Sequence, residues 1–71
     1  MAMRDLVLEA IQMRNAGKSR DEIHRHIWKG ASALGLITSN GDQDAFEIRL
    51  VETGEIIFFN DKNGYSYRPT S

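Results

Sequence analysis

The sequence predicts an α+β fold, in which an N-terminal helical hairpin packs on a three-stranded antiparallel β-meander in a single small domain, residues 1–71. Two observations support this prediction. Apolar residues recur at helical spacing in the first half of the chain, and three short strand-like runs separated by turn residues follow in the second half. The predicted helices span about residues 3–16 and 19–34, and the predicted strands span about residues 45–51, 55–60 and 65–68.

Each predicted helix has an apolar stripe on one side and at least one residue pattern that marks where it begins or ends. The second begins with the capping-box pattern Ser19-Arg20-Asp21-Glu22, and Gly17 suits the residue just past the end of the first. Gly30 lies inside the second helix, where glycine costs about 1 kcal/mol relative to alanine. It therefore indicates a kink, a break, or close packing against the sheet. The two inward stripes are Met3, Leu6, Val7, Ala10, Ile11 and Met13 in the first helix, and Ile23, Ile27, Ala31 and Leu34 in the second.

The three predicted strands differ in their apolar pattern. Apolar residues alternate with polar ones from Phe46 to Leu50, which is typical of a half-buried strand. The uninterrupted run Ile56–Phe59 predicts a central strand that is apolar on both faces. Gly54 and Asn63-Gly64 are turn signals on either side of that strand. We expect a loop from Thr38 to Asp44.

Two helices can cover only one face of the predicted sheet. Ile57 and Phe59 point opposite to Ile56 and Phe58, so one of these pairs lacks a partner within the chain. Exposed apolar patches of this kind commonly mark interfaces, and aromatic residues dominate binding hot spots. We therefore expect a protein partner or a homodimer, with apolar anchors and a polar rim on the free face. The predicted anchors are Ile57, Phe59, Tyr65 and Tyr67, and the predicted rim is Glu47, Arg49 and Glu55.

The composition bounds the class of protein. The chain has 71 residues, no cysteine and a net charge of −1, and no apolar run approaches the roughly 20 residues that span a bilayer. We expect a soluble cytoplasmic protein without membrane contact. The charge is uneven, since residues 1–35 carry six basic and four acidic side chains, whereas residues 36–71 carry three and six. Such asymmetry can orient a partner or pair two copies head to tail.

Catalytic and metal-binding patterns are poorly represented. The chain lacks a thiol nucleophile and a Gly-x-Ser-x-Gly elbow, and its glycines form no phosphate loop. His24 and His26 diverge by roughly 200° on a helix. Glu22 and His26 share a face, but no clear third zinc ligand lies nearby. We expect no enzyme, no cofactor, no metal site and no small-molecule substrate.

The functional prediction is a small non-enzymatic binding or regulatory module that acts through protein–protein interaction. In size and composition it is similar to the small regulators and inhibitors that bacteria and their phages carry. The alternative is DNA binding, because helix, turn, helix and hairpin loosely resemble a winged helix-turn-helix. The segment Ala31–Leu36, where a recognition helix belongs, lacks side chains that read bases. The nucleic-acid residues in this alternative are Lys18, Arg20, Arg25 and Lys29.

Overall fold

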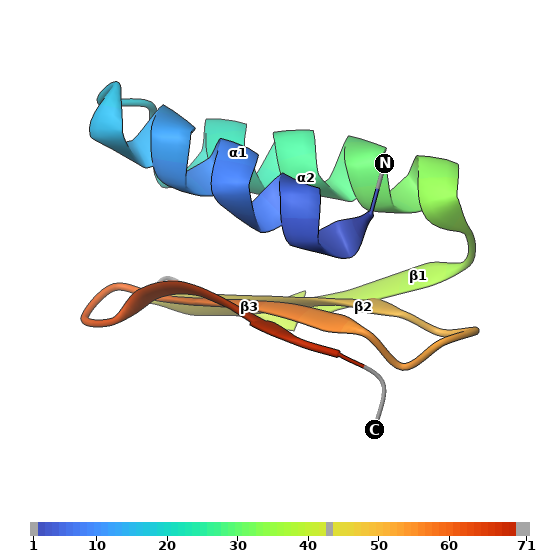
Figure 1. Ribbon diagram of the computed structural model, residues 1–71. Coiled ribbons are helices and arrows are strands. Elements are labelled where there is room, and N and C mark those ends of the chain that lie inside the picture. Colours follow the sequence, from blue (N-terminus) through green and yellow to red (C-terminus); the bar gives the residue numbers. More distant parts are fainter. Residues whose placement is uncertain (1, 43, 70–71) are drawn as a thin grey trace.

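The computed structural model describes residues 2–42 and 44–69 and has two layers, a helical hairpin over one face of an antiparallel sheet (Figure 1). The opposite face of the sheet carries no helix. The strands follow one another in the sheet in chain order, so β1 and β4 are its two edges. The elements are α1 (Met3–Asn15), α2 (Arg20–Leu34), β1 (Ile37–Gly41), β2 (Ala45–Leu50), β3 (Ile56–Asn60) and β4 (Gly64–Arg68).

The α+β class and the helical hairpin are confirmed, but the sheet has four strands rather than three. The additional strand, β1, lies in the segment that was predicted as a loop; Gln43 of that loop lies outside the described residues. All of β1 except the half-buried Ile37 is exposed. An edge strand of this kind is held by main-chain pairing with β2, so its sequence shows no apolar alternation.

The helix ends follow the predicted signals. The Glu22 amide donates a hydrogen bond to Ser19 Oγ at 3.2 Å, which caps α2. Gly17 has a φ of 84°, the left-handed conformation that ends a helix most easily at glycine. Its amide donates to the Arg14 carbonyl, and the Lys18 amide donates to that of Met13. Within the described residues, neither helix is long and apolar enough to cross a membrane.

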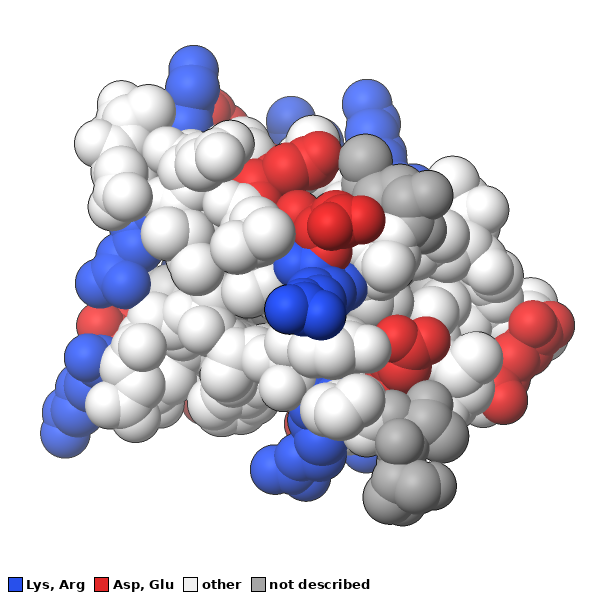
Figure 2. All heavy atoms as spheres, viewed as in Figure 1, with Lys and Arg blue, Asp and Glu red and all other residues white. Residues whose placement is uncertain are grey.

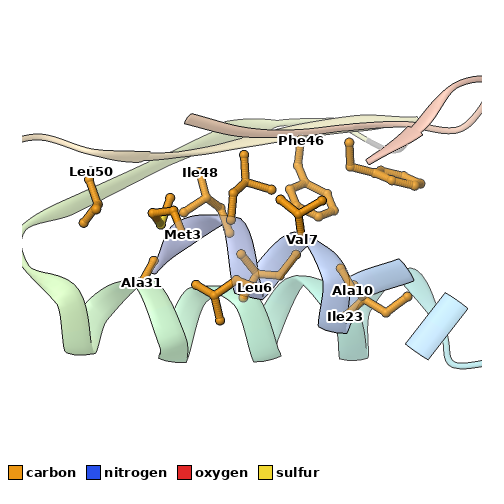
Figure 3. Packing of buried hydrophobic residues seen from close by; sticks show 12 residues of the cluster. Met3, Leu6, Val7, Ala10, Ile23, Ala31, Phe46, Ile48 and Leu50 are labelled. Carbon is orange, nitrogen blue, oxygen red and sulfur yellow. The ribbon is translucent and has the colours of Figure 1, made fainter. Parts of the chain in front are cut away.

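The core lies between the helical hairpin and the inner face of the sheet (Figure 3). In Figure 3 the sheet lies above the helices, and apolar side chains from α1 and α2 point toward the sheet while those of the strands point back toward the helices. The predicted helical stripes are largely confirmed, except that Ile11 is exposed and Met13 and Leu34 are half-buried. The core residues are Met3, Leu6, Val7, Ala10, Ile23, Ile27, Ala31, Phe46, Ile48, Leu50, Ile57 and Phe59.

Strand register decides which apolar pair of β3 is covered. Ile57 pairs with Ile48, and Phe59 pairs with Phe46, so both face the helices. The prediction that Ile57 and Phe59 anchor the free face is therefore wrong. Both pairs of β3 residues are equally apolar, so the run Ile56–Phe59 by itself does not say which pair faces inward.

The two predicted tyrosine anchors also lie on the inner face. Tyr65 pairs with Phe59, and Tyr67 pairs with Ile57 across β3 and β4. Both tyrosines are half-buried and pack against the core. The outer face instead presents Phe58, while Ile56 on that face is mostly covered.

Gly30 neither kinks nor breaks α2, which runs without interruption to Leu34. It marks close packing, but against α1 rather than the sheet. A Cβ at position 30 would lie 2.3 Å from Leu6 Cδ2 and 3.1 Å from Leu6 Cδ1. The absence of a side chain at Gly30 therefore lets the buried Leu6 approach the backbone of α2.

Candidate functional site

The uncovered face of the sheet carries two of the three predicted rim residues. Glu47 and Arg49 lie on β2, 3.4 Å apart between Oε1 and Nη2. A small hollow of about 170 Å³ lies on this face, and its apolar lining consists of one phenylalanine and one isoleucine. The hollow is lined by Glu47, Ile56, Phe58, Ser66 and Arg68.

A larger hollow lies on the opposite side of β2, between α2 and the edge strand β1. It has a volume of about 600 Å³. Its walls combine the first turns of α2 with the strand β1 and the turn that follows it. The lining residues are Arg20, His24, Ser39, Asn40, Gly41, Asp42 and Phe46.

Arg20 fixes the start of α2 to the β1–β2 turn. Its Nη2 donates to the main-chain carbonyl of Asp42 and, at 3.3 Å, to that of Ala45. Its guanidinium carbon lies 5.4 Å from the centroid of the Phe46 ring, within cation–π range. Asp42 Oδ1 in turn accepts from the amides of Asp44 and Ala45, and these bonds lower the pKa of the Asp42 carboxyl. The charged groups at this end of the hollow therefore hold the turn in place.

His24 forms the middle of the hollow. Its Nε2 lies 3.1 Å from Ser39 Oγ, and its ring meets the Phe46 ring edge-on at a centroid distance of 4.5 Å. Burial lowers the pKa of His24, the Arg20 guanidinium lowers it further, and Asp21 offsets part of the effect. The lowered pKa favours the neutral form of the His24 ring at pH 7, and the ring joins the second turn of α2 to the middle of β1.

A second hollow of about 430 Å³ adjoins the first, because both have His24 and Ser39 in their walls. Asp21, Arg25 and Trp28 complete its lining, and these three lie on one stripe of α2. Trp28 is 38% exposed. Arg25 forms no ion pair with another described residue. We call the two hollows together with the outer edge of β1 the edge groove.

The two edges of the sheet are covered differently. α1 packs over β4, whereas α2 packs mainly over β2 and leaves β1 largely uncovered. Pro69 follows β4 directly, and a proline there suits a blocked edge. Of the two edges, β1 is the one that α2 leaves largely uncovered and that adjoins the two hollows.

The winged-helix resemblance is wrong as to fold, since the described residues contain two helices and Ala31–Leu34 forms the last turn of α2. The four basic residues of that alternative are not gathered at one site. Arg20 and Arg25 line the edge groove, Arg25 also shares a smaller hollow with Lys29, and Lys18 lines a hollow between α1 and α2. On the face in Figure 2, basic side chains lie mostly at the margins and acidic ones lie among them, without a continuous basic stripe.

The two histidines point to different neighbours. His26 Nε2 lies 3.0 Å from Glu9 Oε2 and links α2 to α1, whereas His24 faces Ser39. In residues 2–42 and 44–69, no three histidine or carboxylate side chains lie close enough together to hold a metal ion.

Tyr67 and the third predicted rim residue, Glu55, meet at the end of the sheet near the β2–β3 turn. Tyr67 Oη donates to Glu55 Oε2 at 2.5 Å, and this hydrogen bond raises the pKa of Tyr67. Glu55 also accepts from Thr53 Oγ1 at 2.9 Å. Glu55 is thus held by the chain itself and does not join Glu47 and Arg49 in a rim.

Tyr65 should make the protein sensitive to alkali. Burial raises the pKa of Tyr65 to about 12, although Arg14 and Arg20 oppose the effect. Because the folded-state pKa lies above the ordinary value of 10, the stabilisation is present below pH 10 and is lost as the pH rises through about 12. We expect the phenolate absorbance of Tyr65 to develop together with unfolding in this window.

Tyr65→Phe is the control for the alkaline transition. The Tyr65 hydroxyl is buried and has no hydrogen-bond partner among the described residues. Its removal should therefore leave the stability at pH 7 equal or higher. The variant should also unfold less steeply above pH 10. An alkaline transition identical in both proteins would contradict the assignment to Tyr65.

The edge groove was only partly predictable. Arg20 and Arg25 were predicted as nucleic-acid residues because of their charge, but most of β1 was predicted to be a loop. A signal was available in the Asp21, Arg25 and Trp28 stripe, which recurs at helical spacing outside the core-facing stripe. Comparisons with protein-family models, curated proteins and solved structures found no match for this chain.

Proposed function

We propose that the chain is a small non-enzymatic protein-binding module that takes an extended segment of a partner along the open edge of β1. The observation that carries this proposal is the hollow of about 600 Å³ between β1 and α2. Strand addition at a sheet edge gains affinity from main-chain hydrogen bonds and specificity from pockets for alternate side chains. The edge groove supplies both features.

The chemistry of the groove defines the segment that fits it. Successive side chains of an added strand point to opposite faces, so every second side chain would enter the hollow under α2. Trp28, with the aromatic contact of His24 and Phe46 beside it, suits an apolar side chain. Arg25, which has no described ion-pair partner, suits a carboxylate. The preferred ligand is therefore an extended peptide with apolar and acidic residues on one face.

A displayed library of random linear peptides tests this proposal. We expect the selected peptides to shift the backbone NMR signals of Ile37–Gly41 and of the α2 residues that line the edge groove. Trp28→Ala should weaken binding by about 30-fold or more, as expected for an aromatic hot spot. Circular dichroism would verify that the variant is folded.

Phe58→Ala is the matched control. Phe58 is 39% exposed and Trp28 is 38% exposed, but Phe58 lies on the outer face of the sheet. The Phe58→Ala variant should bind the selected peptides as the unmodified chain does. Selected peptides that depend on Phe58 rather than Trp28, or a library that yields no peptide bound at β1, would contradict the proposal.

A further inference from the structure

We propose that a second copy of this chain occupies the edge groove, through antiparallel pairing of the two β1 strands about a two-fold axis. This inference rests on the proposed function and names the partner. Pairing of this kind would join the two sheets into one and place one α2 helix on each side of the junction. The hollows of both copies would then close against each other.

The position of the axis follows from the contact between α2 and β1. The His24–Ser39 contact of 3.1 Å places residue 24 of the helix level with the middle of β1. A two-fold axis that runs between the two β1 strands at the level of their midpoints therefore passes beside α2 at the level of residue 24. Residues equally far on either side of that point come level with each other in the two copies.

The charges on this side of α2 are self-complementary about that axis. Asp21 and Arg25 lie on the open stripe, one helical turn apart, and their midpoint is one residue from His24. With a rise of about 1.5 Å per residue, Asp21 of each copy comes within about 3 Å of the level of Arg25 in the other. A long arginine side chain spans such an offset. Two equivalent ion pairs would form, which is the pattern that an isologous interface requires.

Trp28 extends the same stripe away from the axis. Its exposed ring would lie over the junction, toward the start of the other copy's helix. Interfaces commonly have aromatic residues in their core and charged residues at their rim, and Trp28 beside the Asp21–Arg25 pairs fits this arrangement. A second copy thus provides apolar surface, strand pairing and complementary charge together.

A charge exchange tests this inference. Asp21→Arg places two arginines opposite each other in a homodimer, and Arg25→Asp places two aspartates opposite each other. Each variant alone should raise the dissociation constant of the dimer by about tenfold or more. In an equimolar mixture, every arginine of one variant faces an aspartate of the other, so a heterodimer should form with affinity close to the original. Light scattering over a dilution series measures the molar masses.

Lys18→Asp is the control, since Lys18 is exposed and lines a hollow between α1 and α2 that contains no residue of the edge groove. It should dimerise as the unmodified chain does, and circular dichroism would establish that each variant is folded. A chain that stays monomeric at all concentrations, or variants that dimerise unchanged, would overturn the inference. If the monomer still binds selected peptides at β1, the proposed function stands and only the second copy is excluded.

Discussion

Phe59→Ala is expected to lower the free energy of unfolding by about 3–5 kcal/mol, the usual cost of removing a buried aromatic ring. Phe59 is 6% exposed, and its ring centroid lies 5.2 Å from that of Phe46 and 4.7 Å from that of Tyr65. The total free energy of unfolding of a protein is only about 5–15 kcal/mol, so this loss is a large part of it. The melting temperature should fall by about 12–40 °C, given about 4–8 °C per kcal/mol in a domain of this size. Thermal and urea unfolding followed by circular dichroism measure the loss.

The neighbouring Phe58 provides the comparison. Phe58→Ala removes the same ring from the same strand, but from the outer face, where 39% of the residue is already exposed. We expect a loss of no more than about 1–2 kcal/mol. Equal losses for the two variants would contradict the assignment of the two faces of β3.

Gly30→Leu is expected to destabilise the protein by about 2–3 kcal/mol, because the new side chain overlaps Leu6 in a closely packed core. A Cβ alone would lie 2.3 Å from Leu6 Cδ2. This cost should exceed the advantage of about 1 kcal/mol that ordinary residues have over glycine inside a helix. Gly30→Ala should be less harmful, since alanine adds only the Cβ. Urea denaturation measures both variants.

A double-mutant cycle separates crowding from other effects of the substitution. In a Leu6→Ala background, space is available beside position 30, so Gly30→Leu should cost less there by about 0.5–3 kcal/mol. Ser32→Leu, an exposed substitution in the same helix, should be nearly neutral. A Gly30→Leu protein as stable as the unmodified chain would show that α1 and α2 are not this close.

The sequence predicted those parts of the fold that leave a periodic pattern. The helical stripes around Leu6 and Ile27, the cap at Ser19 and the central strand Ile56–Asn60 all follow local rules, and the structure contains them. β1 was missed because an exposed edge strand needs no apolar alternation; only its pairing with β2 defines it. Close packing was one of three predictions for Gly30. The neighbour that requires glycine there, Leu6, belongs to the other helix, so the sequence around Gly30 could not identify it.

The candidate site was harder to predict because it is formed between elements far apart in the chain. His24 meets Ser39, and Arg20 meets the carbonyls of Asp42 and Ala45, across 15 to 25 residues of sequence. The anchors predicted on β3, Ile57 and Phe59, lie in the core because of the register in which β3 pairs with β2. When both faces of a strand are apolar, the alternation of side chains does not show which face is buried. Charge identified Arg20 and Arg25 as notable residues, but their position beside an open strand required the fold.

Amide hydrogen exchange along β1 tests most directly whether this edge is the binding surface. The amides of Ile37–Gly41 that do not bond to β2 should exchange as fast as loop amides in a dilute sample. They should become protected in a concentrated sample, or when a selected peptide is added, because main-chain hydrogen bonds then cover the edge. Exchange of these amides at the same rate in all three samples would contradict the assignment of β1 as the binding edge.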